Sequence, residues 1–174
     1  MCDESELRLL QSRKIKLLKA AGLSELKKEL ESQPPKRVLE LCMRLAKHKK
    51  ENKELLTYLL YEADNEPSYI KSIKEDVDLQ FNEMNKSNFY FAKKSLRKIL
   101  RLLNKYSRYS GSKQTEAELL LYFCRKLKDS GISIHKSQIL INMYDRQIFK
   151  IKAALSKMHE DLQYDYQKEL EELI

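Results

Sequence analysis

The residues with the clearest capacity for chemistry are the cations of segment 91–113, which reads FAKKSLRKILRLLNKYSRYSGSK and contains no carboxylate. Its eight positive charges belong to Lys93, Lys94, Arg97, Lys98, Arg101, Lys105, Arg108 and Lys113. Guanidinium and ammonium groups at one-turn intervals can neutralise the phosphates of a nucleic acid, and they also attract acidic proteins and anionic membranes. The segment therefore raises the question of which anion its cations face.

Helical geometry gathers these cations on one side. At about 100° per residue, the cations from Lys86 to Arg108 fall within an arc of about 140°, and the apolar side chains fall on the opposite side. We therefore predict a helix from Ser87 or Asn88 to near Gly111, with a buried apolar face and an exposed basic face. The basic strip, as we name it, consists of Lys94, Arg97, Lys98, Arg101, Lys105 and Arg108, and Tyr109 lies at its edge.

The basic strip needs something to offset its own repulsion, since like charges three or four residues apart destabilise a helix by about 0.2–0.5 kcal/mol per pair. Four answers stay open. Acids of the helix expected at 67–83 or of the tail 160–172 could pair with the strip. A nucleic-acid backbone could bind it, with Tyr90 and Tyr109 available for base stacking. An acidic protein or an anionic membrane could bind it, or the strip could be a solvated face.

No base-reading pattern accompanies the basic strip. The sequence has no RNP signature and no recognition-helix pattern, so nucleic-acid binding would depend on charge and shape. The net charge of +8 is also uneven along the chain. Residues 84–115 carry nine cations and no acid, whereas residues 60–83 and residues 160–174 each sum to −5. The charge is therefore segregated into separate regions.

Groups for catalysis or metal binding form no recognisable constellation. There is no G-x-x-x-x-G-K-[ST], G-x-G-x-x-G or G-x-S-x-G motif, and three scattered glycines cannot build a phosphate-binding loop. His48, His135 and His159 are isolated and form no H-E-x-x-H motif. Cys42 and Cys124 lie beside leucines, which is typical of small core residues. We therefore expect no enzymatic activity, no cofactor and no metal site.

The composition is typical of a helical protein. Only three Gly and three Pro occur in 174 residues, and apolar residues recur at intervals of three and four. The longest apolar run is about seven residues, far below the roughly 20 that span a membrane. Three widely spaced cysteines without a C-x-x-C pair indicate reduced thiols. We therefore expect an all-α cytoplasmic protein without a transmembrane segment.

The apolar spacing predicts about seven or eight helices. Pro35 suits a first helical turn, Asn52 can cap the following helix, and Thr115 with Glu118 forms a capping box. Gly131 is an expected helix stop. The predicted ranges are about 5–21, 24–31, 35–50, 53–64, 67–84, 88–111 and 115–129, with a last helix from Ser133 or His135 to Met158 or on to Leu173.

Two pairs of segments echo each other. KRVLELCMR at 36–44 matches RKILRLLNK at 97–105, and KELLTYLL at 53–60 matches AELLLYFC at 117–124. Paired helices repeated in this way resemble HEAT-like and armadillo-like α-solenoids, in which each unit buries its apolar face against its neighbours. The resemblance implies a right-handed helical repeat, an α-α superhelix. An irregular helical bundle is the alternative.

The expected organisation is a single helical domain over 1–174. Within it we expect an N-terminal helical cap at 1–33, helical repeats at 34–158, and an acidic C-terminal helix or tail at 159–174. The residues expected to be nearly fully buried are Leu39, Leu56, Leu100, Leu103, Leu120 and Phe123.

The sequence thus predicts a non-catalytic helical interaction module that binds a macromolecule through the basic face of residues 86–108. The partner would be an acidic protein surface or a nucleic-acid backbone, contacted by the basic strip and Tyr109. The alternative is a nucleic-acid-processing enzyme, or another nucleic-acid-binding protein, on a helical-repeat scaffold with a site that no motif reveals.

Overall fold

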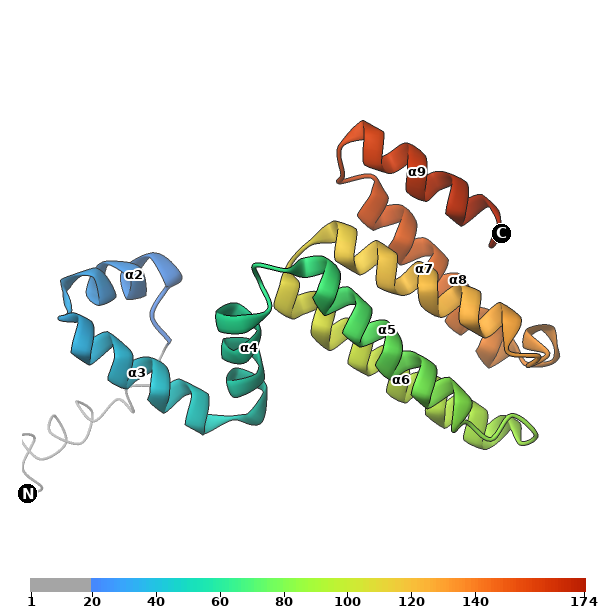
Figure 1. Ribbon diagram of the computed structural model, residues 1–174, viewed down its shortest axis with the longest axis horizontal. Helices are drawn as coiled ribbons and strands as arrows, with labels where there is room; N and C mark the ends of the chain where they lie inside the picture. The colour runs from blue at the N-terminus through green and yellow to red at the C-terminus, as the bar shows by residue number, and fades with distance from the viewer. Residues whose placement is uncertain (1–19) are drawn as a thin grey trace, which may run out of the picture. The chain divides into compact units, whose positions relative to one another are not determined.

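The structure is a computed structural model that describes residues 20–174, and within this range it contains helices and no strand (Figure 1). Eight α-helices, α2 to α9, and one short 3-10 turn make up the described elements. The all-α prediction is confirmed. The predicted helix at 5–21 falls almost wholly outside the described residues, apart from its last two positions, which are not helical.

The chain divides into two compact units, and we describe each by itself. The first unit ends at His48, and the second is Lys49–Ile174. In the first unit, α2 (Leu23–Ser32) and α3 (Pro35–His48) have no buried side chain. The assignments of one domain, an N-terminal cap and repeats stay predictions.

The second unit is a set of helices packed around α7. Its elements are α4 (Lys50–Tyr61), α5 (Glu66–Asn82), α6 (Phe89–Ser110), α7 (Lys113–Asp129), the 3-10 turn η1 (Ile134–Lys136), α8 (Gln138–Leu155) and α9 (Glu160–Glu171). Helix α7 packs against α5, α6, α8 and α9, and α6 also packs against α4. Figure 1 shows α5, α6, α7 and α8 with their axes roughly aligned.

Sequence explains why α7 is central and α6 is peripheral. Three consecutive leucines of α7, Leu119 to Leu121, are all buried, so this helix must be covered on several sides. Helix α6 instead buries one stripe, which includes Leu96, Ile99 and Leu103 at 0% exposure. The remaining face of α6 is available to solvent.

Four of the six predicted core residues are buried: Leu100, Leu103, Leu120 and Phe123. Leu56 is half-buried, and the prediction for Leu39 is wrong because this side chain is 62% exposed. The physical reason is that more helices cover α6 than cover α3. Helix α6 is packed against three other helices, whereas the described part of the first unit offers α3 only the short helix α2.

Several predicted helix ends are confirmed. Helix α3 begins at Pro35. Gly111 and Gly131 have φ angles of 69° and 76°, and they follow the ends of α6 and α7. This left-handed backbone region is the one that glycine adopts without a steric penalty.

Other predicted helix ends are wrong. Helix α4 begins at Lys50, so Asn52 lies inside it and does not cap it. Ser112 caps α7, its Oγ accepting a hydrogen bond from the backbone N–H of Thr115. The Thr115 hydroxyl donates instead to Glu66 of α5 at 2.5 Å. The capping-box prediction is therefore wrong, because Ser112 caps the helix and the Thr115 hydroxyl binds the Glu66 carboxylate.

The C-terminal region contains two helices, which agrees with the predicted alternative that the last long helix ends near Met158. Helix α8 begins at Gln138, later than Ser133 or His135, because the 3-10 turn η1 precedes it. It ends at Leu155, and α9 starts after a four-residue break at 156–159. Leu170 and Leu173, at the end of this region, are buried in the core.

Candidate functional site

The basic strip is positioned by the anchoring of α6 in the core. Asn88 caps the helix, its side chain accepting a hydrogen bond from the Tyr90 N–H at 2.9 Å. Four side chains spaced three or four residues apart on the opposite face are fully buried: Ala92, Leu96, Ile99 and Leu103. Because this stripe fixes the rotation of α6, the opposite face has to point away from the core.

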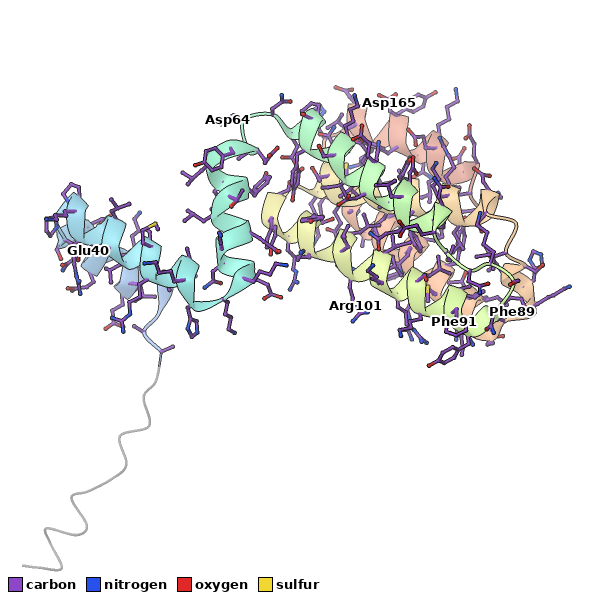
Figure 2. The ribbon with its side chains drawn as sticks, turned by 60° about the horizontal axis from the view of Figure 1, so that its bottom comes forward. Glu40, Asp64, Phe89, Phe91, Arg101 and Asp165 are labelled. Carbon is purple, nitrogen blue, oxygen red and sulfur yellow. The ribbon has the colours of Figure 1, made fainter. Side chains whose placement is uncertain are left out.

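Five of the six strip residues are exposed: Lys94, Arg97, Lys98, Arg101 and Arg108. Figure 2 shows the Arg101 side chain extending from α6 away from the other helices. Arg101 Nε donates to the Arg97 carbonyl at 3.3 Å, and Arg108 Nε donates to the Asn104 carbonyl at 3.2 Å. Within residues 20–174, none of the five exposed cations forms an ion pair.

Three of the acids that could have neutralised the strip contact cations of α7 instead. Asp78 of α5 is 2.8 Å from the Lys126 ammonium. Glu169 and Glu172, near the C-terminus, are 3.5 and 3.4 Å from the Arg125 guanidinium. The described residues therefore do not show the strip paired with segment 67–83 or with the C-terminal tail.

Lys105 and Tyr109 differ from the rest of the predicted site because they contact α4. The Lys105 ammonium is 2.9 Å from the Glu54 carboxylate, and the Tyr109 hydroxyl donates to the same carboxylate at 3.0 Å. The hydrogen bond from Lys105 lowers the pKa of Glu54. Burial and the bond to Glu54 raise the pKa of Tyr109 to about 12. Lys105 is therefore the member of the strip that contacts α4, and Tyr109 lies beside it.

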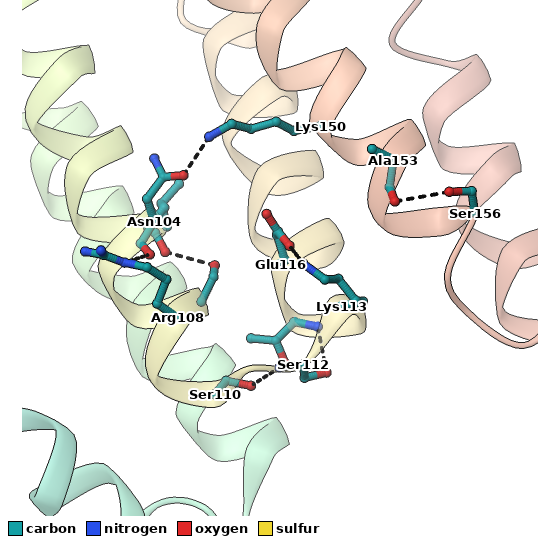
Figure 3. Close-up of polar contacts among 12 residues, drawn as sticks. Asn104, Arg108, Ser110, Ser112, Lys113, Glu116, Lys150, Ala153 and Ser156 are labelled. Carbon is teal, nitrogen blue, oxygen red and sulfur yellow. Dashed lines mark hydrogen bonds and ion pairs between the residues drawn. The ribbon is translucent and has the colours of Figure 1, made fainter. Parts of the chain in front are cut away.

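Helix α8 adds cations beside the strip that the sequence reasoning missed. Lys150 donates to the Asn104 side chain at 2.8 Å, and Figure 3 shows it reaching from α8 towards α6 near Arg108. Arg146, one turn before Lys150, is exposed. The signal available in the sequence was the spacing of these two cations, four residues apart on one helix. Which helix they would lie beside depended on a contact across 46 residues of chain.

Aromatic side chains are exposed at the N-terminal end of the strip. Phe89, Tyr90 and Phe91 are 41%, 68% and 48% exposed. Figure 2 shows Phe89 and Phe91 at this end of α6. The rings of Tyr90 and Phe91 lie 5.4 Å apart in an edge-to-face arrangement. By helical spacing Tyr90 is on the same face as Arg97 and Arg108, so a ring and several cations share one surface.

Other chemistry is sparse in the described residues. No group of three or more His, Cys, Asp or Glu side chains that could hold a metal ion occurs there. Cys124 is fully buried, and burial raises the pKa of its thiol to about 12, so it is protonated at neutral pH. None of the helices in residues 20–174 has the length and apolar character needed to cross a membrane.

Comparisons of the chain with models of protein families, with curated proteins and with solved structures found no match. We therefore base the functional proposal on the geometry and charge of the second unit.

Proposed function

We propose that this protein is a non-catalytic interaction module that binds the phosphate backbone of a nucleic acid through the basic strip of α6. The observation that supports this function most directly is the row of five exposed cations with no ion pair within residues 20–174. An ordinary solvated helix face mixes charges of both signs, because opposite charges at this spacing are slightly favourable and like charges are not. A bound polyanion would relieve the repulsion along the row.

The dimensions of the strip suit an extended polyanion. Lys94 and Arg108 are separated by fourteen residues of α6, which corresponds to about 21 Å at about 1.5 Å per residue. Arg146 and Lys150 of α8 widen the cationic surface on one side. Such a surface can contact several phosphates of one strand at once, and phosphate contacts fix position without reading sequence.

The exposed rings favour a nucleic acid over a uniformly acidic protein surface. Tyr90 lies on the strip face with 68% of its surface exposed, and a nucleobase can stack on such a ring. Arg97 and Arg101 carry planar guanidinium groups that match phosphate geometry. We therefore infer charge-driven binding with little sequence specificity and with a contribution from stacking on single strands.

The test is the salt dependence of binding to labelled single-stranded RNA and to duplex DNA, measured by fluorescence anisotropy. Phosphate neutralisation predicts that log K falls linearly with log salt, with a slope of about −0.9 per contact on duplex DNA and about −0.7 on single strands. Lys94→Ala should reduce the magnitude of the slope by the amount that corresponds to about one phosphate contact. The proposal is wrong if the wild-type protein binds neither nucleic acid at low salt. Binding to anionic vesicles without binding to either nucleic acid would indicate that the strip contacts a membrane surface.

A further inference from the structure

A cavity of about 510 Å³ lies between α4, α5 and α6. This volume is within the range of small-molecule sites, roughly 300–1,000 Å³. Its lining combines tyrosine rings with carboxylates, and this chemistry is opposite to that of the basic strip. A ligand of this cavity would therefore differ from the polyanion proposed for the basic strip. A site here does not depend on the proposed function.

One wall of the cavity is a chain of four tyrosines. The ring centroids of Tyr58 and Tyr69 are 4.6 Å apart, and those of Tyr69 and Tyr106 are 6.1 Å apart. Tyr109 continues the chain at 6.1 Å from Tyr106. Hydrogen bonds hold three of the hydroxyls, since Tyr58 donates to Glu66, Tyr69 to the Tyr106 carbonyl and Tyr109 to Glu54. The rings are therefore fixed in place before any ligand arrives.

Carboxylates complete the lining. Glu62 of the α4 C-terminus and Glu75 and Asp76 of α5 all face the cavity, and none forms an ion pair within residues 20–174. Ile73 and Leu79 of α5 also line the cavity and add apolar surface to it. A ligand that fits this lining has an apolar body and a positive charge.

One ammonium group of the protein itself lies against the tyrosine rings. The Lys105 ammonium lies 4.8 Å from the centroid of the Tyr106 ring and 2.9 Å from the Glu54 carboxylate. A cation over a tyrosine face with a carboxylate beside it is a favourable arrangement, because both groups attract positive charge. The intramolecular contact shows that the edge of the cavity accepts an alkylammonium ion, whereas the acids on the α5 side have no such partner.

We propose that this cavity binds an aliphatic ammonium ion, with its charge between Glu62, Glu75 and Asp76 and its methylene chain against the tyrosine wall and Leu79. Two sources share this chemistry, a free polyamine and a lysine side chain presented by another protein. The chain's net charge of +8 disfavours unspecific attraction of polycations, so binding would have to come from this local site.

Calorimetric titration of the full chain tests the proposal with two probes, spermidine and the peptide acetyl-Gly-Lys-Gly-amide. Asp76→Asn combined with Glu75→Gln should weaken binding about tenfold or more, because both changes remove charge and keep shape. The matched control is Asp165→Asn with Glu171→Gln, which makes the same change of charge at exposed acids of α9. The control should leave affinity within about twofold.

The outcomes separate the two sources. Spermidine binding that depends on Asp76 and Glu75, without peptide binding, supports a free polyamine as ligand. Peptide binding with the same dependence supports a lysine side chain. Absence of binding for both probes, or equal loss in the two double variants, overturns the proposal. Thermal unfolding followed by circular dichroism checks that each variant is folded, and these exposed positions carry little folding energy.

Discussion

The Lys105 ammonium lies 2.9 Å from the Glu54 carboxylate, so one of the six cations of the basic strip is held against α4 while the other five face outward. This pair divides the strip by role. Lys105 contacts α4 through Glu54, and the five exposed residues are those that we propose bind a nucleic acid.

Lys105→Ala should lower the free energy of unfolding by about 0.5–1.5 kcal/mol, because it removes a partly buried ion pair and leaves Glu54 with fewer partners. Lys94→Ala is the matched control on the exposed part of the strip and should change stability by less than about 0.5 kcal/mol. Urea unfolding measures both. Equal effects of the two substitutions would show that the Lys105–Glu54 contact does not stabilise the fold.

Glu66 connects α5 to three other helices, since its carboxylate accepts hydrogen bonds from Ser110 of α6 at 2.5 Å, Thr115 of α7 at 2.5 Å and Tyr58 of α4 at 2.8 Å. Burial raises the pKa of Glu66, but the three hydrogen bonds outweigh it and hold the pKa below its ordinary value. A carboxyl group with a lowered folded pKa adds stability above its unfolded pKa of about 4.3, and this is lost as the pH falls through the folded pKa.

Glu66→Gln should therefore destabilise the protein at pH 7, by about 1–3 kcal/mol, and by less as the pH falls below about 4. Urea unfolding of wild type and variant across this pH range gives the difference directly. A difference that stays constant from neutral to acidic pH would contradict the assignment, because the charged form of Glu66 would then not be the form that the fold stabilises.

Leu100 tests the predicted core. It is 8% exposed on α6, and Leu100→Ala should cost about 2–5 kcal/mol through lost burial and a cavity. Leu60 of α4, in the same unit, is 61% exposed, and Leu60→Ala should cost less than about 0.5 kcal/mol. Chemical denaturation measures both values, and similar losses would mean that the rotation of α6 differs from the one described.

The sequence was sufficient for features that one helix determines by itself. The segregation of cations and apolar residues along α6 fixed which face is buried, and the structure places Leu103 inside and Arg101 outside accordingly. The same pattern failed for Leu39, because an apolar stripe becomes buried only if other helices cover it. The Lys105–Glu54 and Lys150–Asn104 contacts join residues 51 and 46 positions apart. Such contacts depend on how the helices pack, which no local spacing encodes.

Tyr90 distinguishes single-stranded from duplex partners. Tyr90→Ala removes an exposed ring from the strip face and should weaken single-stranded RNA binding by about 1–3 kcal/mol, since unpaired bases can stack on the ring. Duplex DNA presents its bases already stacked, so its affinity should hardly change. Tyr90→Phe, which keeps the ring, is the control. Equal weakening for both nucleic acids would assign Tyr90 a role other than stacking.

The central claim is that the exposed cations of α6 bind a nucleic-acid backbone, and the most direct test is the double charge reversal Arg97→Glu with Arg101→Glu. Neither side chain forms an ion pair within residues 20–174, and the change would place acids one turn from Lys93 and Lys105. The melting temperature should therefore stay the same or rise slightly. Lys71→Glu with Lys168→Glu, at exposed positions of α5 and α9, is the control with the same change of net charge.

The measurement is the affinity for single-stranded RNA at low salt, by anisotropy, for wild type and both double variants. The proposed function predicts loss of binding by more than about a hundredfold in the α6 variant and a far smaller loss in the control, since only the former removes direct phosphate contacts. Equal affinities of the two double variants, with both folded, would contradict it.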